Sequence, residues 1–238
     1  MTEARPLGPF VSFSPALAPS NKTILTGRTI TLEPLAPKHA KDFYTLVGGD
    51  DPAKNHLWDY LADEPYTQLE VFQKSIEAKS KSLDPLFYAI IDQRPAVFTS
   101  GKPIGYLALM RITPEQWTIE IGHVVFSAAL QRTTGATEAI YLLARHAFED
   151  LNYRRVEWKC DSLNAPSRKA ALRLGFTFEG IFRHHMVVKG RSRDTAWFAF
   201  LKDEWNATIK PAMEKWLDET NFNEDGSQKK SLQDLRAQ

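Results

Sequence analysis

Hydrophobic residues recur along the chain with two different spacings, which predict strands and helices in turn. Residues 29–35 alternate between apolar and polar side chains as a half-buried strand does, and Pro37 can begin the helix that follows. Residues 66–82 place apolar side chains on one side of a helix. Three apolar runs of strand length come next, at 86–92, 102–111 and 117–126.

The second half of the chain contains the clearest helix. Its apolar residues recur at helical spacing and form a single stripe, which consists of Ile140, Leu143, Ala144, Ala147, Phe148 and Leu151. Asn152 is a suitable residue to end this helix. Residues 154–160 then alternate strictly, with Val156, Trp158 and Cys160 on one face, as a half-buried strand would.

Capping residues predict one more helix between Asn164 and Gly175. Asn164 is a good N-cap, Pro166 is tolerated in the first turn, and Gly175 can adopt the left-handed conformation that ends a helix. Two strands and a last helix complete the pattern, at 176–188, 195–201 and 203–217.

This order of elements predicts an α/β (α+β) fold. We expect one mixed, mostly antiparallel, twisted sheet of about seven strands with helices on both faces. Residues 1–27 are rich in Pro and Ser and are expected to form an extended arm. Residues 28–217 form the predicted domain, and residues 218–238 are expected to form a polar, mobile tail.

Composition narrows the class of protein. Thirty Lys and Arg against 29 Asp and Glu leave a net charge of +1, so no global field attracts the protein to nucleic acid or to an anionic membrane. The single cysteine, Cys160, excludes an intramolecular disulfide and a multi-cysteine zinc site. The first residues lack the pattern of a secretory signal, and no apolar stretch is long enough to span a membrane. We therefore expect a cytoplasmic protein.

Any anionic ligand must be held locally, and one turn is suited to it. Residues 131–137, QRTTGAT, join a strand to the clearest helix, so their free backbone amides can point at an anion with Arg132 beside them. Gly135 would allow the ligand to approach the backbone closely. Because Arg132 lies just before Gly135 and the start of the helix, we expect its side chain to contact a phosphate and not to be a solvated surface charge.

Two blocks of sequence carry a resemblance to a known family. RTTGAT at 132–137 and NAPSRKAALRLGFTFEG at 164–180, with IEIGHVVF upstream, resemble the GNAT superfamily of acetyl-CoA-dependent N-acetyltransferases. The match is nearest to the group that contains the ribosomal-protein N-terminal acetyltransferases, and it covers roughly residues 28–202. The first block departs from the family's usual pattern at Thr137, and the second is the more specific.

The resemblance implies a set of cofactor contacts. The strand 117–126 would splay from its neighbour, so that its late backbone groups pair with the pantetheine arm of acetyl-CoA and one amide polarises the thioester carbonyl. The residues implied for the cofactor are Val124, Val125, Phe126, Gln131, Arg132, Thr133, Thr134, Gly135, Ala136, Thr137, Asn164 and Arg168. No metal is expected to take part.

Acetyl transfer to an amine also needs proton transfer, because an ammonium of pKa about 10 has no lone pair with which to attack. Glu120 is the candidate base, Ser167 is the candidate acid, and Asn164 would position groups near the cofactor. Glu120 could equally pair with a Lys or Arg across the sheet, and Ser167 could only cap its helix. His123 lies on the opposite strand face from Glu120 unless a bulge intervenes, so we expect it to be structural.

The acceptor side is expected in residues 50–66. Acidic groups and aromatic rings there suit a cationic amine, and the substrate-binding candidates are Trp58, Asp59, Tyr60 and Asp63. A solvated acidic loop with aromatic anchors is an equal alternative. The predicted function is direct transfer of an acetyl group to a small amine, an amino acid or a peptide N-terminus. A non-catalytic acyl-CoA-binding regulator or an interaction protein stays open, as does a homodimer.

Overall fold

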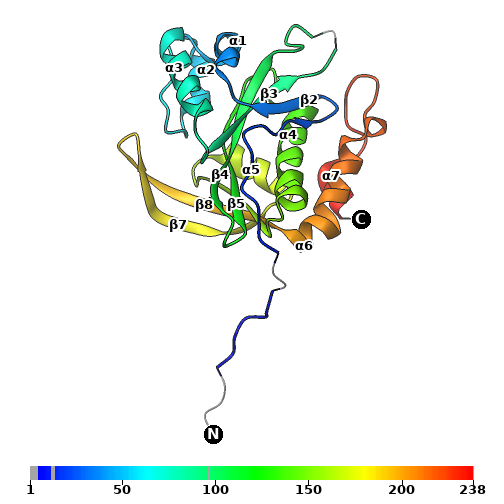
Figure 1. Cartoon of the computed structure of the whole chain (residues 1–238). Helices are drawn as coiled ribbons and strands as arrows, with labels where there is room; N and C mark the ends of the chain where they lie inside the picture. Colours follow the sequence, from blue (N-terminus) through cyan, green and yellow to red (C-terminus); the bar gives the residue numbers. More distant parts are fainter. Residues whose placement is uncertain (1–4, 12–13, 96, 238) are drawn as a thin grey trace.

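The computed structural model describes residues 5–11, 14–95 and 97–237, and eight strands of these residues form one twisted sheet (Figure 1). The strands are β1 (Leu25–Thr26), β2 (Ile30–Pro34), β3 (Leu86–Asp92), β4 (Pro103–Thr113), β5 (Thr118–Phe126), β6 (Arg155–Asp161), β7 (Thr177–Val188) and β8 (Arg191–Leu201). Their order is β1-β2-β3-β4-β5-β6-β8-β7, and every neighbouring pair is antiparallel except β5 with β6. The predicted mixed, mostly antiparallel sheet is confirmed.

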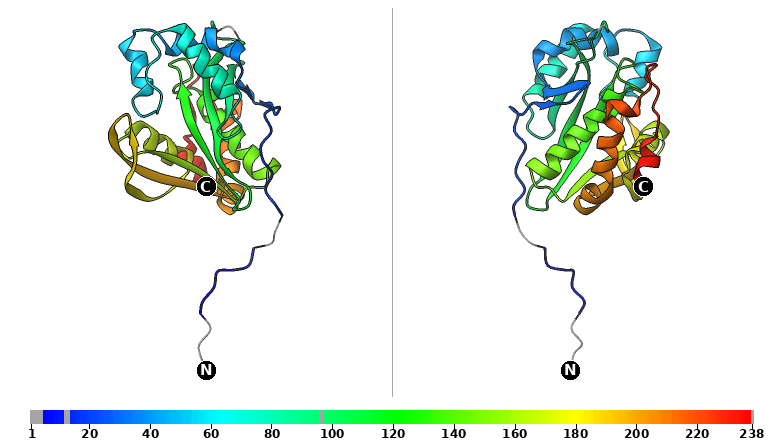
Figure 2. Two further views of the ribbon diagram at one scale, coloured as in Figure 1. Left: turned by 60° about the vertical axis from the view of Figure 1, so that its left-hand side comes forward. Right: turned by 90° about the vertical axis from the view of Figure 1, so that its right-hand side faces the viewer.

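Helices cover both faces of the sheet, as the sequence predicted (Figures 1 and 2). One face carries the short helix Pro37–His39, α1 (Ala40–Val47), α2 (Pro52–Asn55), the turn His56–Trp58 and α3 (Leu69–Ser80). The other face carries α4 (Thr134–Arg145), its π-helical continuation His146–Asp150, α5 (Ala165–Leu174) and α7 (Lys210–Leu217). The remaining helical segments are α6 (Lys202–Glu204), Trp205–Ile209, Glu219–Asn221 and α8 (Leu232–Arg236).

Successive side chains of a strand point to opposite faces of the sheet, so each face has its own hydrophobic core. Phe87 and Ala89 of β3 pack against α1 and α3, whereas Tyr88 and Ile90 of the same strand belong to the core beneath α4. Asn152 has φ of 63° and ends the long helix where the sequence predicted an end.

Two irregularities of β5 shape the centre of the sheet. β5 pairs with β6 only over residues 118–120 and 155–157, and beyond these residues the two strands no longer pair. On its other edge, Tyr106 pairs with Val125 and Ala108 pairs with Gly122, so Leu107 alone lies opposite both His123 and Val124. The extra residue is a β-bulge next to His123, whose φ is 49°.

Both terminal segments differ from their expected descriptions where the structure describes them. Within the expected arm, Leu25 and Thr26 form a strand with β2, and the amide of Leu17 donates to the carbonyl of Leu151. Within the expected mobile tail, α8 packs onto the domain and buries Leu232 and Leu235. Residues 1–4, 12–13 and 238 of these two segments lie outside the described residues.

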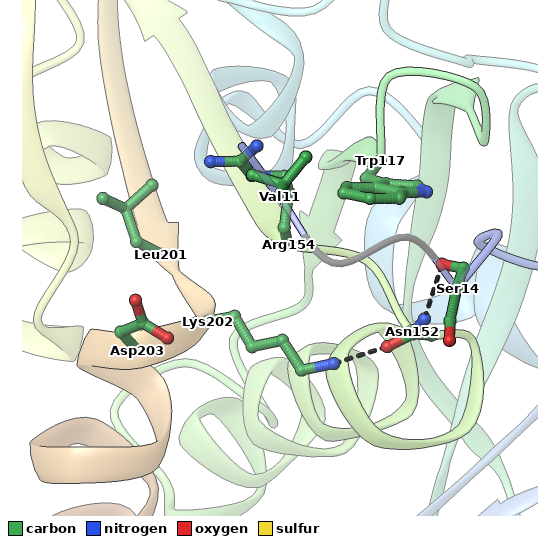
Figure 3. Close-up of a pocket in the computed structure, with 8 residues that line it drawn as sticks. All are labelled: Val11, Ser14, Trp117, Asn152, Arg154, Leu201, Lys202 and Asp203. Carbon is green, nitrogen blue, oxygen red and sulfur yellow. Dashed lines mark hydrogen bonds between the residues drawn. The ribbon is translucent and has the colours of Figure 1, made fainter. Parts of the chain in front are cut away.

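A small pocket of about 370 Å³ lies where the N-terminal segment passes the end of β8 (Figure 3). The side chain of Asn152 bridges its rim, since its Nδ2 donates to the carbonyl of Ser14 at 2.9 Å and its Oδ1 accepts from Lys202 at 2.6 Å. This pocket is separate from the gap between β5 and β6. In the part of the chain that the structure describes, no helix has the length and apolar character needed to cross a membrane.

Candidate active site

A cavity of about 1510 Å³ opens where β5 and β6 stop pairing, and its lining includes Glu120–Phe126 of one strand and Trp158–Asp161 of the other. Its charge is unbalanced. Eight cationic residues line it, namely Arg28, Arg94, Arg111, Arg132, Lys159, Lys169, Arg173 and Arg193. Three acidic residues line it, namely Glu120, Asp161 and Glu219. In a chain of net charge +1, this excess indicates a site for an anionic ligand.

The turn before α4 forms one end of this cavity. Gln131, Arg132, Thr133 and Thr134 line it, and so do Ala136 and Thr137 in the first turn of the helix. Thr133 is the N-cap but its hydroxyl donates to the carbonyl of Leu130 at 2.7 Å, so it does not cap the helix amides. Amides of the first turn have no intrahelical acceptor, and together with the helix dipole they suit a phosphate.

Gly135 has a different role from the one expected. It is absent from the cavity lining, and a Cβ at this position would lie 2.8 Å from Cγ2 of Ile30. The glycine therefore allows α4 to pack closely against β2, which is a packing requirement and not an approach of the ligand.

Glu138 fixes this end of α4, and the sequence analysis did not identify it. Its buried carboxylate accepts hydrogen bonds from the amides of Arg28 at 2.6 Å, Thr29 at 2.8 Å and Ile30 at 3.2 Å. It also accepts one from the Thr29 hydroxyl at 2.5 Å. The first turn of α4 is thus held against the start of β2.

Arg94 is a second contributor that the sequence did not reveal. Its guanidinium donates to Asp92 through Nε at 2.9 Å and through Nη2 at 2.7 Å, and Nη2 also donates to the carbonyl of Ala129 at 3.2 Å. Burial opposes the charge of Asp92, but hydrogen bonds from Arg94 and Thr99 outweigh it and hold the pKa of Asp92 below its usual range. Arg94 is therefore a fixed cation beside the phosphate turn.

One face of α5 lines the cavity. Pro166, Lys169, Ala170 and Arg173 recur at the spacing of one helix face, which the sequence could have shown. Arg168, the expected cofactor contact, is not among the lining residues, because its Nη1 donates to the carbonyl of Ser162 at 3.1 Å. Lys169 and Arg173 replace it as candidate phosphate ligands.

Asn164 and Ser167 lie at the start of α5 and both line the cavity. The Oδ1 of Asn164 accepts from the amide of Ser167 at 3.0 Å, so the predicted N-cap is confirmed. The Oγ of Ser167 accepts from the indole Nε1 of Trp158 at 3.0 Å. In this bond the oxygen of Ser167 acts as the acceptor, so its hydroxyl proton can still be donated to another group.

Glu120 is buried and already paired. Its Oε2 accepts from Nη1 of Arg111 at 2.6 Å and lies 2.9 Å from Nζ of Lys159. Lys159 also pairs with Glu157 at 2.6 Å and stands 3.9 Å from the centre of the Trp197 ring. Glu120 is therefore engaged in ion pairs with two neighbouring strands, which is the alternative that the sequence left open beside a catalytic base.

His123 differs from its structural expectation, because the bulge in β5 turns it into the same cavity as Glu120. Its ring packs on Phe87 with 5.3 Å between centroids. Burial lowers the pKa of His123; the charges of Lys79 and Arg111 lower it further, whereas Asp63 acts in the other direction. The imidazole is therefore neutral near neutral pH and is able to accept a proton.

Three of the five acidic residues in the loop at 50–66 are in ion pairs, whereas Asp50 and Asp51 are exposed and in no ion pair among the described residues. Asp59 pairs with His56 at 3.0 Å, Asp63 pairs with Lys79 at 3.0 Å, and Glu64 pairs with Lys189 at 3.3 Å. Asp59 and Asp63 are both absent from the cavity lining. The expectation of an acidic patch that attracts a cationic amine is therefore not supported.

The aromatic residues of this loop divide into one that is buried and one that lines the cavity. Trp58 is fully buried, its Nε1 donates to the carbonyl of Val47, and it is an anchor of the core, not a substrate contact. Tyr60 lines the cavity, and its hydroxyl donates to the carbonyl of Leu163 at 3.2 Å. Leu57 and Leu61 line the cavity beside it.

The C-terminal segment forms a wall that the sequence gave no reason to expect. Trp216, Glu219, Phe222, Gly226 and Gln228 all line the cavity. The indole of Trp216 donates to Oε1 of Gln228 at 2.8 Å and stacks under the guanidinium of Arg173 at 4.9 Å. The segment beyond Leu217 is therefore part of the site.

Comparisons with known proteins agree with this geometry. A family model described as an acetyltransferase (GNAT) domain matches residues 29–177. The uncharacterized N-acetyltransferase YnaD of Bacillus subtilis is 29% identical over 103 residues, which are 43% of this chain and 59% of that protein, so the match spans less than two thirds of its length. The ribosomal-protein-serine acetyltransferase of Escherichia coli is 26% identical over 184 residues, or 76% of this chain and 98% of that protein.

A solved structure extends the likeness to almost the whole chain. The crystal structure of a GCN5-related N-acetyltransferase from Brucella melitensis has a TM-score of 0.89 to this chain and 43% sequence identity. The match covers 95% of this chain and 99% of that one, so the likeness extends beyond the residues that the family model matches.

Proposed function

The chain belongs to the GNAT acetyltransferase family, and we propose that it moves the acetyl group of acetyl-CoA to a primary amine. The observation that supports this proposal is the cavity at the gap between β5 and β6. Among the described residues, five of its eight cations are in no ion pair, namely Arg28, Arg132, Lys169, Arg173 and Arg193. Acetyl-CoA carries several phosphate charges, and a cavity with this excess compensates them locally.

The cofactor contacts follow from the lining. We assign the phosphates to the 131–137 turn, with Arg132 and Arg94 beside it, and the adenosine end to Lys169 and Arg173 of α5. The pantetheine arm would take the place of β6 along Val124, Val125 and Phe126, where β5 has lost its partner. The backbone amide near Val125 would stabilise the oxyanion that forms on the thioester carbonyl.

The proton transfers follow from the side chains in the cavity. In a direct transfer, the nitrogen lone pair of the amine forms a bond to the carbonyl carbon, and the C–S bond breaks. We assign His123 to accept the proton of the amine and Ser167 to donate one to the departing thiolate. Glu120 holds Arg111 and Lys159 in place and takes no part in proton transfer in this scheme.

The acceptor is proposed as a small amine, an amino acid or a peptide N-terminus. Because the E. coli relative is named for a serine of a ribosomal protein, peptides that begin with Ser belong in the screen. Cytoplasmic localisation and a homodimer stay predictions.

Calorimetric titration with acetyl-CoA tests the cofactor site. We expect the wild-type protein to bind it, and we expect Arg132→Ala and Lys169→Ala each to raise Kd by about tenfold, since each removes a charge from the cavity. Arg168→Ala is the matched control on the same helix, because its side chain is outside the lining. Folded wild-type protein that does not bind acetyl-CoA would refute the proposal.

A further inference from the structure

The acceptor side of the cavity contains a cation that has no acidic partner. Arg193 of β8 is half-buried and lines the cavity. Its Nε donates to Oγ1 of Thr195 at 3.1 Å, which fixes one edge of the guanidinium. Among the described residues, no carboxylate forms an ion pair with Arg193.

Two acids on or opposite the same part of β8 have other hydrogen-bond partners. Asp194 is the next residue on β8, so alternation places it on the other face, and its Oδ1 accepts from the amide of His184 at 2.7 Å. Asp161 lies across the sheet opposite Thr195, and its Oδ1 accepts from the amide of Leu163 at 2.9 Å. The strand geometry therefore leaves the free edge of Arg193 uncompensated.

The other cations on this side are already bound. Arg111 and Lys159 share Glu120, and Lys159 is also paired with Glu157. Asp59, Asp63 and Glu64 of the 50–66 loop form ion pairs with other basic residues, so they do not compensate Arg193 either. A half-buried guanidinium without a counter-charge is costly, and a ligand carboxylate that accepts two parallel hydrogen bonds would remove that cost.

Arg193 also lies close to Cys160 in the fold. Its strand β8 pairs with β6, where Cys160 lies opposite Ala196, and both Arg193 and Cys160 line the cavity. Cys160 lines the cavity together with Ser167, the group assigned to the leaving thiolate. A group bound by Arg193 would therefore sit near the amine under attack.

We propose that the acceptor carries a carboxylate close to its amine and that Arg193 binds this carboxylate. The inference rests on the proposed acetyl transfer and specifies its substrate class. The carboxylate belongs either to a free amino acid or to an acidic residue near a peptide N-terminus. A neutral or purely cationic amine lacks the group that Arg193 would bind.

The test compares acceptors in which a carboxylate is replaced by the corresponding amide, with acetyl-CoA at saturation and rates expressed per neutral amine. One pair is serine against serinamide, and the other is Ser-Asp-Ala-amide against Ser-Asn-Ala-amide, so the two pairs separate the two sources of the carboxylate. We expect the wild-type enzyme to prefer the carboxylate member of at least one pair by about tenfold or more in kcat/KM. Arg193→Gln should bring that ratio close to one without changing KM for acetyl-CoA, and Arg193→Lys should retain part of it.

Arg191→Gln is the matched control, because Arg191 is an exposed arginine on the same strand and is absent from the lining. It should keep the wild-type ratio. The inference is overturned if the wild-type enzyme treats both members of each pair alike. It is also overturned if Arg193→Gln weakens acetyl-CoA binding or affects both members equally.

If acetyl transfer itself is wrong, a different result is expected. The protein would then bind acetyl-CoA but release no CoA with any amine. In that case, titration of the CoA-loaded protein with the same peptide pairs still tests Arg193. Preferential binding of the carboxylate member that is lost in Arg193→Gln supports the inference, and equal binding of both members refutes it.

Discussion

At the scale of single residues, one extra residue in β5 determines that Glu120 and His123 point into the same cavity. On a regular strand these residues, three apart, would lie on opposite faces. The bulge brings both into the cavity, where Glu120 is bound by Arg111 and Lys159 and His123 is not in an ion pair. The assignment of the base therefore moves from the carboxylate to the imidazole.

We predict that His123→Gln lowers kcat by about 100-fold or more, because general base catalysis typically contributes that much. The folded-state pKa of His123 is lowered by burial and by Lys79 and Arg111, so the neutral ring persists to a pH below about 6.5 and is lost only as pH falls further. The wild-type kcat/KM should therefore decline on the acid side, and the variant should lose that decline. A pH–rate profile measures it.

His56→Gln serves as the control for that profile. His56 is exposed, pairs with Asp59 and lies in the loop at the edge of the cavity. Its substitution should leave the acid side of the profile unchanged. An acid-side decline that survives in His123→Gln would assign the proton transfer to another group.

At the scale of elements, the phosphate turn depends on how α4 is fixed to β2. Gly135 lets the helix approach Ile30, and Glu138 accepts hydrogen bonds from three consecutive backbone amides of the neighbouring chain segment. The carboxylate is buried together with Thr29 and Ile30, so water does not readily replace it as the acceptor for these two residues.

We predict that Glu138→Ala destabilises the fold by about 3 kcal/mol, since it leaves several buried donors without an acceptor. Denaturant unfolding measures the loss, and Glu138→Gln should recover part of it because the amide oxygen still accepts. Glu77→Ala is the control, because Glu77 is exposed and forms only a surface pair with Lys81. If the denaturant midpoint of Glu138→Ala equals that of Glu77→Ala, Glu138 is not a structural anchor.

At the scale of the whole molecule, the C-terminal segment completes both the core and the cavity. Leu232 and Leu235 are buried against the domain, and Nη2 of Arg236 donates to the carbonyl of Leu172 in α5. Phe222 and Gln228 line the cavity. The last twenty residues therefore link the stability of the domain to the shape of its ligand site.

We predict that a chain ending at Leu217 is less stable by about 3 kcal/mol or more, because two buried leucines are lost. It should also bind acetyl-CoA more weakly. Thermal unfolding and calorimetry measure the two effects. Gln228→Ala keeps the buried leucines and isolates the cavity wall, and removal of the last two residues is the control for chain length. Unchanged acetyl-CoA affinity in the chain that ends at Leu217 would exclude the segment from the site.

The sequence by itself determined the elements and placed the turn at 131–137 directly before the long helix. Strand alternation, the helical stripe and the caps Asn164 and Gly175 are encoded in neighbouring residues, because they depend on local backbone angles and on side-chain periodicity. The two motif blocks also indicated the family before any contact was known.

Only the tertiary structure decided which side chains act together. The pairing of Glu120 with Arg111 and Lys159 joins three strands, and the orientation of His123 depends on a bulge that alternation does not reveal. The ion pairs of Asp63 with Lys79 and of Glu64 with Lys189, and the C-terminal wall of the cavity, likewise join residues far apart in sequence. Such contacts depend on register and packing between elements, and a shift of one residue exchanges the two faces of a strand.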